Sequence, residues 1–105
     1  MRRGEVWWAE LPLPVGRRPV VLLSRDAAYR VRTSVTVGMV TRVARNIPVE
    51  VALGPEDGMP QRCVVNLDQI LTIPRVRLVS RITSLSGQKM ALVARAIVFA
   101  LDLEL

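Results

Sequence analysis

Hydrophobic residues in the first 85 positions occur in short stretches rich in Val, Ile, Leu and Trp, separated by turn-forming residues. This pattern is typical of a β-rich chain. Six stretches are predicted as strands: 4–11, 18–24, 34–41, 48–53, 63–73 and 79–85. The segments 11–16 and 54–60 are rich in proline and glycine and are predicted as loops. Residues 25–30 can form one helical turn. The pattern therefore predicts a small curled antiparallel sheet.

The last twenty residues follow a different period and predict a helix. Ser86 is a suitable N-cap, and Leu85 and Met90 have the spacing of a hydrophobic staple. Polar residues then recur about every seven positions, which leaves a single thin solvent-facing stripe. The wide apolar face either packs deeply against the sheet, which we favour, or is partly reserved for a partner or a second copy.

Two strands contain residues that interrupt their apolar pattern. Gly38, inside 34–41, predicts a bulge or a close backbone approach. Asn66, Asp68 and Gln69 introduce polar groups into 63–73, and we expect that strand to break near Asp68. A buried carboxylate without a partner is costly. Asp68 is therefore expected at a strand end, paired with an arginine, or in a functional site.

The charge balance indicates a polyanionic partner. The chain has 15 Lys and Arg residues against 9 Asp and Glu, a formal net charge of +6, and every cation except Lys89 is arginine. Such a field favours nucleic acid or an acidic protein segment, and we favour nucleic acid. The length of 105 residues predicts one domain, 1–105.

The composition also argues against disulfide bonds, metal and cofactor sites, and secreted or membrane-spanning proteins. Cys63 is the only cysteine and there is no histidine, so no intrachain disulfide can form and neither a metal site nor a cofactor is expected. The N-terminus lacks the apolar region of a signal peptide. The apolar stretch 90–101 is interrupted by Arg95 and is too short to cross a bilayer. We expect a cytoplasmic protein.

Arg17 and Arg18 stand immediately before Pro19 and the apolar run 20–23. Proline fixes its own φ and favours an extended residue before it, so Arg18 should project from a rigid strand entrance. A guanidinium held in this way suits a phosphate. The simpler alternative is that both arginines are solvated charges at the rim of the sheet.

Two further places combine groups that could bind a ligand or take part in chemistry. Thr41 and Arg42 end a strand just before a polar loop that also contains Arg45. Trp7 and Trp8 are adjacent on a strand, so one indole should face away from the core and could stack on a base. Each also has a plain interpretation: a threonine with β propensity, and a tryptophan at a protein interface.

Taken in order, several of these stretches resemble the MazF/PemK-type toxin endoribonucleases. The resemblance covers 3–103, and it rests on residues 3–7, 16–24, Thr41, 63–70 and 81–86. It implies an SH3-like barrel with a C-terminal helix, a homodimer, and a groove across the dimer for single-stranded RNA. It also implies a cognate antitoxin whose acidic, partly disordered tail occupies that groove.

The resemblance also implies roles for individual residues. Arg18 and Thr41 match the family's catalytic arginine and threonine, and Asp68 matches the catalytic aspartate of the PemK branch. Asn66 departs from the arginine of that branch, and the loop 11–16 is shorter than usual and lacks an acidic residue. The expected RNA-binding residues are Trp8, Arg17, Arg42, Arg45, Asn66 and Gln69.

The implied reaction is attack by the RNA's own 2′-hydroxyl, which gives a 2′,3′-cyclic phosphate and a 5′-hydroxyl without a metal. Arg18 and Thr41 can stabilise the charge that develops on the phosphate oxygens. Either Asp68 or a strongly perturbed Arg18 could accept the proton, and the sequence leaves both open.

Functions of other classes are also compatible with a small basic β-rich chain. One is a non-catalytic RNA- or ribosome-binding module, and another is a toxin of related fold that poisons DNA gyrase by protein contact. A module that only binds would not need the Thr41 hydroxyl.

Overall fold

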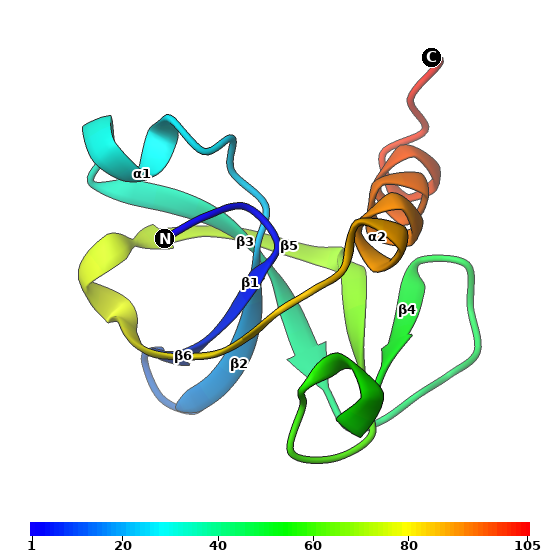
Figure 1. Ribbon diagram of the computed structural model, residues 1–105, viewed down its shortest axis with the longest axis horizontal. Helices are drawn as coiled ribbons and strands as arrows, with labels where there is room; N and C mark the ends of the chain where they lie inside the picture. Colours follow the sequence, from blue (N-terminus) through cyan, green and yellow to red (C-terminus); the bar gives the residue numbers. More distant parts are fainter.

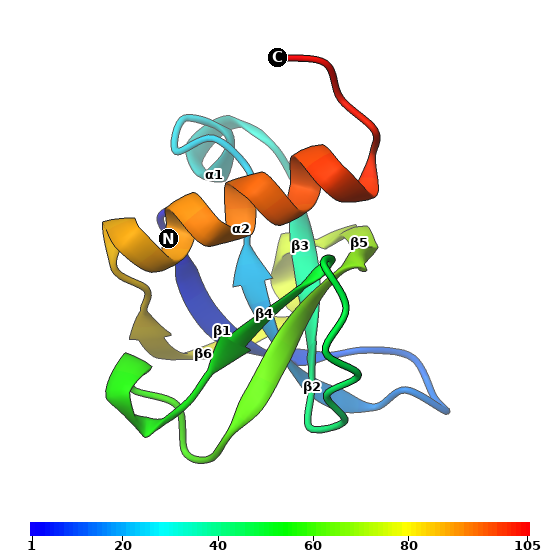
Figure 2. The same cartoon turned by 90° about the vertical axis from the view of Figure 1, so that its right-hand side faces the viewer.

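The computed structural model describes residues 1–105. Its six strands form one antiparallel sheet in the spatial order β4-β5-β3-β2-β1-β6, which curls on itself with helix α2 lying across it (Figures 1 and 2). The strands are β1 (Glu5–Glu10), β2 (Arg17–Leu22), β3 (Ser34–Thr41), β4 (Glu50–Leu53), β5 (Cys63–Pro74) and β6 (Leu78–Ser84). The expected curled sheet with a C-terminal helix is therefore confirmed.

The helical elements are short except for the last. Helix α1 is Ala28–Val31, η1 is Pro55–Asp57, η2 is Arg75–Arg77, and α2 is Gly87–Ala100. The helical turn expected at 25–30 begins three residues later, at the point where Ala28 and Tyr29 become buried. None of the helices combines the length and the apolar character of a membrane span.

Ser86 caps α2 as its sequence position predicted, because its Oγ accepts a hydrogen bond from the Lys89 N–H at 3.1 Å. The helix packs less deeply than we expected. Only Val93 and Ala96 are buried, whereas Leu92 and Phe99 are 44% and 61% exposed. Met90, Ile97 and Ala100 are partly buried against the core cluster, so the apolar face of the helix is wider than the surface that the sheet covers.

The core consists of two apolar clusters on the two sides of the curled sheet. One includes Val21, Val65 and Leu67 and is covered by Val93 and Ala96 of α2. The other includes Val20, Leu22 and Tyr29. Successive β2 residues therefore point into different clusters, as strand alternation requires. Burial on both faces holds β2 rigidly in the centre of the sheet.

Strand β5 does not break at Asp68, as the sequence had suggested, but contains a bulge. Met39 pairs with Asn66 and the adjacent Gly38 pairs with Ile70, so that residues 67–69 have no partner on β3. A Cβ on Gly38 would lie 3.1 Å from Val65 Cγ2, which confirms the expected close approach there. The bulge turns Asp68 outward while the strand continues.

Candidate active site

Arg18 and Thr41 lie at the same edge of the central sheet. Val20 pairs with Met39 and Val21 with Gly38, and Arg18 and Thr41 each stand two residues beyond the last pair, at the same end of β2 and β3. Arg18 is exposed and Thr41 is half-buried. Both residues line two neighbouring pockets, so they form the boundary between them.

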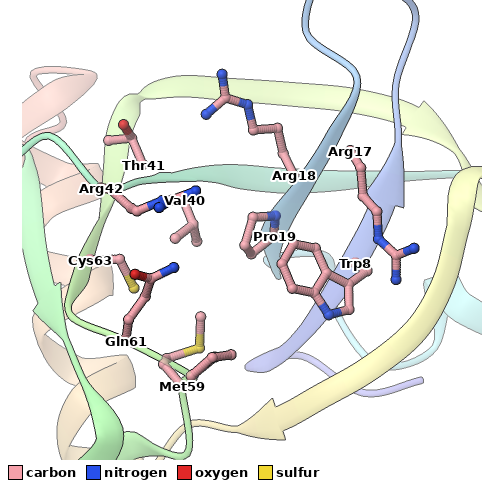
Figure 3. Close-up of a pocket in the computed structure, with 11 residues that line it drawn as sticks. Trp8, Arg17, Arg18, Pro19, Val40, Thr41, Arg42, Met59, Gln61 and Cys63 are labelled. Atoms are coloured by element: carbon pink, nitrogen blue, oxygen red, sulfur yellow. The ribbon is translucent and has the colours of Figure 1, made fainter.

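The first pocket has a volume of about 180 Å³ (Figure 3). Strands β1 and β2 supply one wall, and the chain between η1 and β5 supplies the other. Besides Arg18 and Thr41 its lining consists of Trp8, Arg17, Pro19, Val40, Arg42, Met59, Pro60, Gln61 and Cys63. This mixture of apolar surface with guanidinium and carboxamide groups suits a nucleobase next to a phosphate.

Trp8 and Arg17 form one side of this pocket. The Arg17 guanidinium carbon lies 5.0 Å from the Trp8 ring centroid, a cation–π contact. Arg17 Nη1 also lies 3.8 Å from Glu10 Oε1. In Figure 3, Arg17 and Arg18 point in opposite directions from β2. Arg17 is therefore partly neutralised, while Arg18 forms none of the four ion pairs.

The two tryptophans differ in their surroundings. Trp7 packs against the core cluster that contains Val20, and its Nε1 donates to Glu5 Oε1 at 2.9 Å. Trp8 is half-buried and lines the first pocket. As expected, one tryptophan packs on the core and the other faces away from it. Trp8 is the indole that a ligand in the first pocket could contact.

The second pocket has a volume of about 470 Å³ and opens beside the β5 bulge. Asp68 and Gln69 line it together with Arg18 and Thr41. The other lining residues are Val15, Met39, Val40, Ile70 and Leu71. Asp68 is the only Asp or Glu among the residues that line the two pockets. The bulge therefore places its carboxylate in the same cavity as the exposed guanidinium of Arg18.

Asn66 holds the bulge from inside the protein. Its side chain is buried, and its Oδ1 accepts a hydrogen bond from the Asp68 backbone N–H at 2.9 Å. The next residue, Leu67, donates its N–H to the Val49 carbonyl at 2.8 Å. Asn66 lines neither pocket. Its position fits a role in orienting Asp68 and not the direct RNA contact that the sequence had suggested.

The remaining predicted residues are divided between the pockets and the surrounding surface. Arg42 lines the first pocket and Gln69 the second. Arg45 lines neither; it is exposed, and its backbone N–H donates to Glu50 Oε1 at 2.9 Å.

The wall formed by Met59, Gln61 and Cys63 was missed by the sequence analysis, which treated 54–60 only as a surface turn. Long-range contacts hold this turn in place. Thr83 Oγ1 donates to the Asp57 carbonyl at 2.9 Å, and Lys89 Nζ lies 3.5 Å from Asp57 Oδ2. Because these partners are distant in sequence, no local pattern could have identified the wall.

The Cys63 thiol faces this pocket but is poorly suited to nucleophilic chemistry. Burial raises the pKa of Cys63, and the negative charge of Asp57 raises it further. Since the thiolate is the reactive form, the side chain acts as pocket lining. No group of three or more His, Cys, Asp or Glu side chains is arranged to hold a metal ion.

The family model described as PemK-like, MazF-like toxin of type II toxin-antitoxin systems matches residues 2–101. The chain belongs to this family. A Mycobacterium tuberculosis H37Rv relative named "Probable endoribonuclease MazF5" is 41% identical over 101 residues, covering 95% of this chain and 92% of its own length. The predicted membership of a family of toxin endoribonucleases is thereby confirmed.

Solved MazF structures have the same fold. The Mycobacterium tuberculosis toxin MazF-mt6 superposes with a TM-score of 0.89 at 32% identity, covering 96% of this chain and 99% of the toxin. A mycobacterial endoribonuclease in complex with its cognate antitoxin superposes with a TM-score of 0.88 at 28% identity, covering all of this chain and 98% of that protein. The predicted fold class is confirmed over nearly the whole chain.

Proposed function

We propose that this MazF-family chain cleaves single-stranded RNA by attack of the 2′-hydroxyl on the adjacent phosphate. The observation that carries the proposal is the common position of Arg18 and Thr41 at the boundary of two pockets, with Asp68 in one of them. A phosphate at this boundary would have a nucleotide on each side. Arg42 and Trp8 would contact the nucleotide in the first pocket, and Gln69 the nucleotide in the second.

In this reaction a bond forms between the 2′-oxygen and phosphorus, and the bond between phosphorus and the 5′-oxygen breaks. The proton of the 2′-hydroxyl passes to a base as the ring closes, and a water molecule gives a proton to the departing 5′-oxygen. The products are a 2′,3′-cyclic phosphate and a 5′-hydroxyl. Arg18 can donate two hydrogen bonds to the equatorial phosphate oxygens, and the Thr41 hydroxyl can donate a third.

Asp68 is our candidate for the group that accepts the 2′-hydroxyl proton. It is exposed in the second pocket and forms no ion pair, so its carboxylate is free to act as a base. A guanidinium such as that of Arg18 is a poor general base, because the group has no free acceptor for a proton. This choice assigns charge stabilisation to Arg18 and proton transfer to Asp68. The same guanidinium supplies the positive charge that a metal ion would otherwise provide, so the proposed reaction requires no metal.

We also propose two protein partners. The first is an antitoxin with an acidic segment, supported by the antitoxin-bound mycobacterial endoribonuclease of similar structure. The second is another copy of this chain, supported by the apolar face of α2, where Leu92 and Phe99 remain 44% and 61% exposed. Pairing would bury this face, and two sites side by side would extend the RNA groove. Sedimentation at micromolar concentration should show a dimer, and a monomer that cleaves RNA at the full rate would contradict the shared groove.

The test is cleavage of a defined single-stranded RNA in EDTA, with the chemistry of both new ends determined. We expect cyclic phosphate and 5′-hydroxyl ends, and no cleavage when the attacking hydroxyl is methylated or when DNA replaces RNA. Activity that disappears in EDTA and returns with Mg²⁺ would contradict the mechanism. Binding without cleavage would favour an RNA-binding module instead.

A further inference from the structure

Positive charge is concentrated at one end of the molecule. Seven arginines lie in the segments 2–3, 25–32 and 75–77, which together contain a single carboxylate, that of Asp26. The rest of the chain contains eight cations and eight carboxylates. The three segments, which we call the basic end, therefore account for the entire formal charge of +6.

Hydrogen bonds join the three segments into one surface. The Arg3 backbone N–H donates to Asp26 Oδ1 at 2.7 Å, and Arg3 Nη1 donates to the Leu23 carbonyl at 2.9 Å. The Arg75 backbone N–H donates to the Thr33 carbonyl at 2.8 Å, and its side chain donates to the Tyr29 carbonyl. Arginines distant in sequence are thus held side by side by the backbone beneath them.

The arginines of this surface have little to neutralise them. None forms an ion pair, and all are exposed except Arg75, which is half-buried. The carboxylate of Asp26 accepts a hydrogen bond from the Arg3 backbone N–H, which occupies one of the oxygens that could otherwise pair with an arginine. Guanidinium groups presented in this way suit phosphates, because their planar donors match two oxygens at once.

The basic end lies at the opposite end of β3 from Thr41. Thr41 ends β3, whereas Ser34 begins it and pairs with Pro74, next to η2. In Figures 1 and 2, α1 lies at the top of the molecule and β3 runs downward away from it. An eight-residue strand spans about 23 Å between its first and last residues. This is roughly the length of seven stacked nucleotides at ~3.4 Å each.

The shape of this surface favours a nucleic acid over a protein segment. None of the three pockets is lined by a residue of the basic end. A peptide usually binds through apolar anchors that fill pockets, whereas a phosphate backbone needs only accessible positive charge. We propose that the basic end binds the phosphate backbone of the RNA substrate several nucleotides from the cut. This rests on the proposed function, since it assumes that the substrate is RNA.

The test compares RNAs of five and about 25 nucleotides that share one cleavage site. The variant R30Q/R32Q/R77Q removes three exposed arginines whose side chains form no hydrogen bond or ion pair within the chain. We expect kcat/KM on the long RNA to fall on the order of tenfold, with no change on the short one. The slope of log affinity against log salt should become shallower by about 2 for the long RNA.

The matched control is R62Q/R81Q/R95Q, which removes the same charge outside the basic end. An equal loss of activity in both variants, or an equal loss on both RNAs, would overturn the proposal. It would show that RNA responds to the net positive charge of the whole protein and not to the basic end.

Affinity for a long 2′-O-methyl RNA, which cannot be cut, is measured in parallel. If this affinity is unchanged in R30Q/R32Q/R77Q, the proposal is wrong even where cleavage succeeds. If the parental protein binds this RNA through the basic end but cuts neither substrate, the proposed function has failed instead. Binding of polyglutamate, a probe for an acidic protein segment, is measured as well. If R30Q/R32Q/R77Q loses polyglutamate binding but keeps its RNA binding, the surface binds an acidic protein and the proposal is overturned.

Discussion

The buried side chain of Asn66 accepts a hydrogen bond from the backbone N–H of Asp68, two residues along the same strand. This contact closes the bulge that turns Asp68 into the second pocket. We expect N66A to lower kcat about tenfold while KM changes little, because the carboxylate loses its fixed orientation. In a D68N background the same change should have no further effect, which a double-mutant cycle measures.

The conservative variant N66D separates orientation from loss of folding. It keeps an acceptor oxygen beside the Asp68 N–H and should retain more activity than N66A. Unchanged kcat in N66A, together with a large loss in D68N, would show that Asn66 does not position the carboxylate.

Removal of either proposed phosphate ligand should reduce turnover with little effect on folding. Arg18 is exposed and Thr41 half-buried, so R18A and T41V leave the core intact. Each should lower kcat on the order of 10²–10³-fold, the usual cost of losing one transition-state donor. Single-turnover cleavage of a fixed RNA measures this, and R62A provides an exposed control. Parental rates in either variant would refute the role assigned to that residue.

Gly58 is a position at which we expect a methyl group to destabilise the fold. Its φ is +90°, and a Cβ there would lie 2.3 Å from Thr83 Oγ1. The unfavourable φ and the overlap together should cost about 2–4 kcal/mol in G58A. Urea unfolding measures the loss. G87A is the matched control, because nothing lies within 4 Å of that Cβ, and it should leave stability unchanged or slightly higher.

Tyr29 should make stability depend on alkaline pH. Burial raises the pKa of its hydroxyl from 10.0 to about 12. The unfolded chain therefore releases this proton more readily than the folded one. The contribution of Tyr29 to the free energy of unfolding is fully present well below pH 10 and is lost as the pH rises towards about 12. The difference in unfolding free energy between the parental protein and Y29F should follow this course, and parallel curves would contradict it.

The parts of the fold that could be predicted from the sequence are those determined by neighbouring residues. Strand β3 has the predicted bounds, and Ser86 caps α2, because β-branched runs and cap spacing are local signals. How much of α2 is buried could not be predicted. The apolar periodicity shows which side chains share one face of the helix, but not how much of the sheet is available to cover that face. Phe99 is exposed for this reason.

The candidate site shows the same division. Arg18 was found because Pro19 follows it and marks a strand entrance. The wall containing Gln61 was missed because the contact between Thr83 and Asp57 spans 26 residues. The inward orientation of Asn66 also depends on tertiary structure, because the bulge appears only when β5 is paired with β3.

The separation of charge between the two ends also affects how two copies can approach each other. Outside the basic end the molecule is neutral overall, with equal numbers of cations and carboxylates. Two copies that meet through their basic ends would bring +6 against +6, whereas contact through the neutral half keeps these charges apart. At physiological ionic strength repulsion weakens beyond about 8 Å, so it acts on the final approach and not on the first encounter. The arginines therefore select the orientation in which this chain can associate with itself.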